Sequence, residues 1–142
     1  MATAQHNVGR EGYWLIEVGL VQLLTGRLTD ALDSFQRAAI LLHRIGHRVR
    51  EAQAWDGEGE AHRALGHLDE AIRLHEKAAN VFRSLDARWL LTVALCNLAI
   101  ALGAAGVIDR AREEAVEAIG LLAEFSDPAA GQIMATLREF AL

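Results

Sequence analysis

The stretch GHLDEAIRLHEKA at residues 66–78 decides the fold, because the stretch GRLTDALDSFQRA stands forty residues earlier, at residues 26–38. The two stretches share one Gly, one Leu and two Ala residues at matching positions, whereas most of their other residues differ. Similarity at a fixed spacing of about 20–50 residues is typical of proteins built from stacked repeats. The pattern therefore predicts a repeat protein in which the small residues are the constrained ones.

Small residues recur in three copies of this pattern, always forty residues apart. The columns are Gly26, Gly66 and Gly106; Ala31, Ala71 and Ala111; Ala38, Ala78 and Ala118; and, seven residues before each glycine, Gly19, Gly59 and Ala99. Two packed helices lie about 8–10 Å apart, and their closest contacts leave room only for Gly or Ala. The columns therefore mark places where two helices touch.

Each copy contains two helical stretches separated by its glycine. In the first copy, apolar residues recur every three to four positions over residues 13–25 and again over 28–45, which is the spacing of one helical face. Acidic residues such as Asp30 open the second stretch, where a carboxylate complements the helix dipole. A glycine between two helices is typical of a C-cap with positive φ. Each copy is therefore predicted to be a helical hairpin.

With these columns the chain resembles the tetratricopeptide repeat, whose first helix ends at a Gly and whose second helix carries two alanines seven apart. Leu15, Trp55 and Leu95 fill the large position early in the first helix. The period exceeds the usual ~34 residues, and the proline expected after the second helix is missing from every copy; longer second helices account for both departures. Forty-residue copies are similar to the repeat arrays of actinobacterial transcriptional regulators, which join such arrays to a DNA-binding domain and a nucleotide-binding switch.

The resemblance covers residues 11–125 and implies an all-α fold, a right-handed superhelical stack of three helical hairpins. The expected repeats are 11–47, 48–87 and 88–126, within a domain at 11–142 that follows a flexible N-terminal segment at 1–10. Ser126 or Asp127 followed by Pro128 predicts the start of one more helix. Because repeat arrays need a cover for their last apolar face, we expect residues 128–141 to be a capping helix.

Composition narrows the class of protein further. A net charge of −5 argues against direct nucleic-acid binding by this domain. The single cysteine, Cys96, allows no internal disulfide and fits a reducing cytoplasm, and no apolar run is long enough for a signal peptide or a membrane span. From the composition we expect a cytoplasmic bacterial protein that does not bind a membrane, and the resemblance implies that it binds a protein or peptide.

Residue patterns that could carry catalysis are weak. His43 and His47 stand four apart, a spacing that suits zinc, but the sequence places no third ligand. Asp56 and Glu60 share one helical face and are expected to be solvated charges instead of an acid–base pair. We therefore expect no enzyme, no cofactor and no metal; a small metal-dependent enzyme is the weaker alternative.

The resemblance also implies a concave groove lined by first-helix residues at fixed steps. Transferred to this chain, the lining residues are Tyr13, Ile16, Leu20 and Leu23; Gln53, Asp56, Glu60 and Arg63; and Val93, Cys96, Asn97 and Ile100. This lining is apolar at both ends and charged in the middle, which favours a basic or mixed ligand segment. His75 and Glu76, inside the quoted stretch, are expected on the surface of the second helix.

One class of this family clamps a C-terminal carboxylate with Lys and Asn side chains at defined groove positions. The matching positions here carry Ile16, Leu20, Gly57, Val93 and Asn97, without a lysine. We therefore expect no carboxylate clamp of that kind.

The first copy differs from the others where it would meet a preceding repeat. Trp14 stands where later copies have Ala54 and Ala94, and Val21 stands where they have Ala61 and Ala101. An uncovered apolar patch of this kind often pairs with another molecule. Self-association through Trp14 and Val21, giving a homo-oligomer, is the alternative function.

Overall fold

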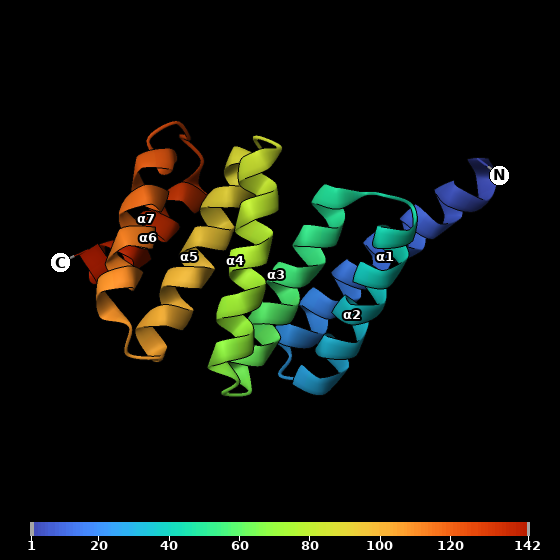
Figure 1. The fold of residues 1–142 in the computed structure, drawn as a ribbon, viewed down its shortest axis with the longest axis horizontal. Helices are drawn as coiled ribbons and strands as arrows, with labels where there is room; N and C mark the ends of the chain where they lie inside the picture. Colours follow the sequence, from blue (N-terminus) through green and yellow to red (C-terminus); the bar gives the residue numbers. More distant parts are fainter. Residues whose placement is uncertain (1, 142) are drawn as a thin grey trace.

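The computed structural model describes residues 2–141, which form seven helices and no strand. The helices are α1 (Ala2–Leu24), α2 (Leu28–Arg44), α3 (Arg48–Ala64), α4 (Leu68–Ser84), α5 (Arg88–Ala104), α6 (Ile108–Leu122) and α7 (Pro128–Ala141). They stand side by side in a row, with the N-terminus and C-terminus at opposite ends (Figure 1). The predicted all-α stack of three hairpins followed by a capping helix is confirmed; the right-handed superhelix stays a prediction.

Helix α1 is longer than its counterparts, with 23 residues against 17 in α3 and α5. It begins at Ala2 and so crosses residue 11, where the sequence placed the end of a flexible segment and the start of the repeats. No proline interrupts this region. The first turns of α1 extend past the end of the stack (Figure 1).

The turns within the hairpins use their glycines as predicted. Gly26, Gly66 and Gly106 have φ of 77°, 84° and 81°, in the left-handed region. The residue after each glycine donates its N–H back across the turn, as from Arg27 to the Gln22 carbonyl at 2.8 Å, which satisfies the last carbonyls of the helix. Each glycine therefore ends one helix and directs the chain into the next.

The row of helices curves because its two layers pack differently. Each helix contacts the next along the chain, and α1 contacts α3, α3 contacts α5 and α5 contacts α7. Within residues 2–141, α2, α4 and α6 make no such contacts with one another. The layer of α1, α3 and α5 is therefore the inner one, and their exposed sides form the concave face.

Packing between neighbouring helices explains the columns of small residues. The fully buried Phe35 ring lies against two glycines of different helices. A Cβ atom added to Gly19 in α1 would approach the ring within 2.7 Å, and one added to Gly57 in α3 within 2.4 Å. The alanine columns are also fully buried: Ala31, Ala71, Ala111, Ala38, Ala78 and Ala118. These contacts are the close approaches that the sequence predicted.

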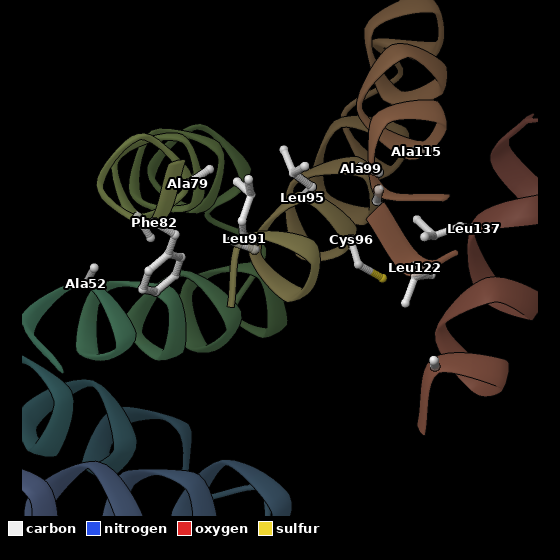
Figure 2. Packing of buried hydrophobic residues seen from close by; sticks show 14 residues of the cluster. Ala52, Ala79, Phe82, Leu91, Leu95, Cys96, Ala99, Ala115, Leu122 and Leu137 are labelled. Carbon is white, nitrogen blue, oxygen red and sulfur yellow. The ribbon is translucent and has the colours of Figure 1, made fainter. Parts of the chain in front are cut away.

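The C-terminal half of the core joins the last hairpin to the capping helix. Phe82, Leu91 and Leu95 pack within it, and Leu137 of α7 is fully buried there beside Leu122 (Figure 2). Because α7 has its own buried side chain, it covers the apolar face of α5 and α6. Among the described helices, none is both long enough and apolar enough to cross a membrane.

We predict opposite effects for alanine at two helical glycines. Gly57→Ala forces a methyl group against the Phe35 ring, which Gly19 confines from its other side, and should lower the free energy of unfolding by about 1–3 kcal/mol. Gly120→Ala in α6 meets nothing within 4 Å and should raise it by about 0.5–1 kcal/mol. Urea denaturation of both variants measures these changes. Equal stability of the two variants would contradict the packing described.

Candidate functional site on the concave face

Six of the twelve predicted groove residues line one cleft of about 140 Å³ between α1, α3 and α5. They are Ile16, Leu20, Gln53, Asp56, Glu60 and Val93. Gly57, Phe82 and Leu90 complete the lining and were not predicted. The forty-residue register pairs Leu90 with Arg50, which was not among the predicted groove residues either, so the repeat gave no signal for it. Phe82 reaches the cleft from α4, outside the layer that the prediction considered.

The other six predicted residues lie elsewhere. Leu23 and Ile100 pack against the hydrophobic cores, and Cys96 and Asn97 are buried. Tyr13 is exposed near the N-terminal end, and Arg63 is partly buried with no hydrogen-bond partner for its Nε atom in the described structure. The cleft thus lies at the centre of the predicted groove, and the wider groove stays a prediction.

A polar cluster of Asp56, His75 and Asn97 lies behind the cleft. The Asp56 carboxylate accepts a hydrogen bond from Nδ1 of His75 at 2.6 Å and one from Nδ2 of Asn97 at 3.0 Å. These residues come from three helices, α3, α4 and α5. Buried hydrogen bonds to a charged group are stronger than neutral ones, so the cluster fixes the position of the Asp56 side chain at the edge of the cleft.

The same positions in the preceding copy are apolar. Forty residues earlier, Asp56 corresponds to Ile16, His75 to Phe35, and Asn97 to Gly57. The His75 ring packs against Gly59, where an added Cβ would approach it within 2.7 Å, as Phe35 packs against Gly19. The Phe35 contact between α1 and α3 is the first interface, and the His75 contact between α3 and α5 is the second. Polar side chains therefore replace an apolar contact at the second interface, while the backbone arrangement is kept.

Two predictions about charged residues were wrong. His75 was expected on the helix surface but is fully buried, because it occupies the position of the Phe35 ring. Asp56 and Glu60 were expected to be solvated, yet both are largely shielded from solvent at the concave face. Aligning the copies at their forty-residue spacing pairs His75 with Phe35 and could have shown this burial.

Glu60 lies in an environment that disfavours its negative charge. Burial raises the pKa of its carboxyl above the ordinary value, and the neighbouring Asp56 charge raises it further; smaller opposing effects come from His75, Arg63 and Asn97. Two carboxylates at one cleft, the first held by hydrogen bonds and the second poorly compensated, form a site that favours a cation.

The other side chains that the sequence offered as candidates for chemistry are Cys96, His43 and His47. Burial raises the pKa of the Cys96 thiol to about 11, so the sulfur is protonated at neutral pH and a poor nucleophile. His43 and His47 are exposed, and Nδ1 of His43 lies 2.9 Å from a Glu51 carboxylate oxygen. In the part of the chain that the structure describes, no three His, Cys, Asp or Glu side chains are grouped to hold a metal ion.

The face of α1 that starts the row is apolar and uncovered. Trp14 is 62% exposed, Val21 60% and Leu24 86%. The corresponding alanines of the later copies, Ala54 and Ala94, are fully buried against a preceding helix. This face, defined by Trp14, Val21 and Leu24, is called the α1 end face below.

Comparisons with known proteins agree with this architecture. A tetratricopeptide repeat family model matches residues 12–84. A crystal structure of a TPR-like protein from Chlorobium tepidum TLS is similar to this chain with a TM-score of 0.80 at 20% sequence identity, over 96% of each chain. At that identity the likeness shows the fold alone. Among curated protein sequences, the search finds no match.

We predict that Asp56→Ala destabilises the fold. The change leaves the buried His75 and Asn97 without their shared acceptor, and should lower the free energy of unfolding by about 1–3 kcal/mol in urea denaturation. Asp33→Ala, which removes an exposed carboxylate of α2, should change it by less than about 0.5 kcal/mol. The hydrogen-bonded cluster would be refuted if both variants were equally stable.

Glu60→Gln should stabilise the fold in a pH-dependent way. Because the pKa of Glu60 is raised in the folded state, the folded chain holds this proton more tightly than the unfolded chain, and ionisation at higher pH disfavours folding. The variant should therefore unfold at higher urea concentration than the parent at pH 7, and the difference should vanish as pH falls below the carboxyl range. Glu113→Gln on the exposed side of α6 is the control, and an equal effect there would contradict the argument.

Proposed function

The chain belongs to the tetratricopeptide repeat family, and from that premise we propose that it is a protein-interaction scaffold whose concave face binds a basic segment of a partner protein. The observation that carries the proposal is the pair of shielded carboxylates, Asp56 and Glu60, at the cleft between α1, α3 and α5. The fold supports a role in protein interaction, and the two carboxylates favour a bound segment with positive charge.

The cleft suits a lysine or arginine side chain of the partner. Ile16, Leu20 and Val93 provide apolar walls for an aliphatic stem, while the carboxylates meet the charged head. A cation placed beside Asp56 and Glu60 relieves the repulsion between them and lowers the pKa of Glu60 toward its ordinary value. Binding is therefore expected to release a proton at a pH where Glu60 is still protonated in the free protein.

A tetralysine peptide tests this site. Its titration, followed by amide NMR, should shift resonances of α3 around Asp56 and Glu60, and binding should strengthen as pH rises through the raised pKa of Glu60, because the carboxylate then becomes charged. Glu60→Gln should weaken binding about tenfold, as expected for loss of one charge-assisted contact. Glu113→Gln removes the same charge from α6 and should bind as the parent does. Equal weakening by both variants would contradict a defined site.

The wider context is a further proposal: this domain belongs to a bacterial transcriptional regulator, where changes in packing between repeats transmit the binding event. The forty-residue copies support it, since they are similar to those of actinobacterial regulators. The coding sequence upstream tests it directly. A winged-helix or nucleotide-switch segment in frame is expected, and an unrelated domain there would contradict it.

Self-association through the α1 end face is the second candidate function. Trp14 and Val21 expose apolar surface where later copies bury alanine, and such surface commonly pairs. Light scattering should give a mass above the 15.5 kDa of one chain. Trp14→Glu or Val21→Glu should return the mass of a monomer, whereas Val116→Glu, at an equally exposed valine of α6, should not. A monomer at high concentration, unchanged by Trp14→Glu, would count against this function.

A further inference from the structure

A second and larger cleft lies at the N-terminal end of the concave face. Its volume is about 770 Å³, and it forms where the early turns of α1 pass beside the turn between α2 and α3. We call it the N-terminal cleft; its lining residues are His6, Gly9, Arg10, Glu11, Tyr13, Trp14, Ile45, His47 and Arg50. Close packing of Gly9 on the Ile45 side chain brings the two segments together, with an added Cβ reaching 3.4 Å.

The polar lining of this cleft is mostly basic. The lining contains Arg10, Arg50 and a single carboxylate, that of Glu11. No ion pair to either arginine is present among the described residues. The guanidinium carbon of Arg50 lies 4.2 Å from the centre of the Tyr13 ring. Stacking of this kind orients the planar donors of Arg50 before any ligand arrives.

This basic character contrasts with the rest of the chain. Residues 1–50 contain six arginines and four acidic residues, a net charge of +2, whereas residues 51–142 contain eight basic and fifteen acidic residues, a net charge of −7. Clefts lined by one sign of charge concentrate ligands of the opposite sign. The N-terminal cleft therefore favours an anion.

We propose that the N-terminal cleft is a second binding site, which takes an acidic stretch of the same partner segment whose basic residue binds beside Asp56 and Glu60. The cleft of about 140 Å³ that these two residues line is called the carboxylate cleft below. The proposal rests on the proposed function and deepens it. Arg10 and Arg50 stand forty residues apart, and the third member of their column, Leu90, lines the carboxylate cleft. The two clefts therefore share one row of positions along the concave face.

The distance between the two clefts determines how far apart the acidic and basic residues of the bound segment lie. Arg50 and Asp56 are six residues apart on α3, a helical rise of about 9 Å with an offset of about 120° around the helix axis, so at least about three residues of extended chain are needed to span it. The segment therefore carries an acidic and a basic side chain separated by about three residues or more.

The size and walls of the N-terminal cleft favour a peptide over an inorganic anion. A volume of about 770 Å³ is within the range of sites that hold drug-sized ligands, which are much larger than an inorganic anion. Tyr13, Trp14 and Ile45 supply apolar surface beside the arginines. Arg10 and Arg50 also differ from the groove positions at which other members of the family clamp a C-terminal carboxylate.

A tetraglutamate peptide tests the N-terminal cleft. Its titration by NMR should shift the indole N–H resonance of Trp14, which lines the cleft, and leave that of Trp89 unchanged, because Trp89 packs against Phe125 at the opposite end. Arg10→Gln and Arg50→Gln should each weaken binding about tenfold. Arg10 is exposed, so its replacement leaves the packing intact. Arg112→Gln, an exposed arginine of α6, should bind as the parent does.

Several outcomes would overturn the proposal. These are no selective shift of Trp14, equal affinity in Arg10→Gln, or an equal shift of Trp14 by inorganic phosphate at matched charge concentration. A Trp14 resonance that moves with protein concentration, and stops moving in Arg50→Gln, would instead assign the cleft to a second copy of the chain. Because tetralysine reports on the carboxylate cleft and tetraglutamate on this one, failure of either site is distinguishable from failure of the other.

Discussion

The contact between the Phe35 ring and the backbone of two helices is the constraint on which the rest of the structure depends. One aromatic side chain of α2 fills the space left by Gly19 in α1 and Gly57 in α3, so three helices are positioned by a single fully buried group. The fully buried Ala31 and Ala38 of α2 allow the same close approach along that helix. At the second interface the His75 ring occupies the same place against Gly59, whereas the third copy has Ala115 there. Helices positioned in this way form the row and its concave face.

The second interface keeps this geometry but changes its chemistry. His75 replaces the aromatic ring and donates to Asp56, which also accepts from Asn97. Nε2 of His75 has no hydrogen-bond partner in the described structure. A buried polar cluster with an unsatisfied atom is less favourable than an apolar contact of the same shape. Stability alone therefore gives no reason for these residues, whereas placing two carboxylates at the concave surface does.

The repeat could be predicted from the sequence because its strongest constraint falls on small residues that recur in register. Turn glycines and paired helices follow from that pattern, and the capping helix follows from the helix-start signal at Pro128. Burial of individual charged residues could not be judged in the same way. A histidine carries no periodic signal by itself, and His75 reveals its position only when aligned with Phe35.

For the site as well, some residues could be predicted from local sequence, and the others depend on three-dimensional packing. Six residues predicted from the fixed steps along the first helices line the carboxylate cleft, whereas Phe82, which enters from α4, was missed. The N-terminal cleft depends on how far α1 extends before residue 11, where the repeats were predicted to start, and on how its early turns lie beside Ile45 and His47. A contact between segments that are distant in the sequence is determined by packing, and no local sequence motif indicates it.

The central claim is that the polar residues of the second interface serve the concave site and not the fold. The most direct measurement replaces them with their counterparts from the first interface, in the triple variant Asp56→Ile, His75→Phe and Asn97→Gly. Urea denaturation and tetralysine titration of this variant should show a free energy of unfolding within about 1 kcal/mol of the parent or higher, together with loss of peptide binding. Retained peptide binding in a folded triple variant would contradict the account.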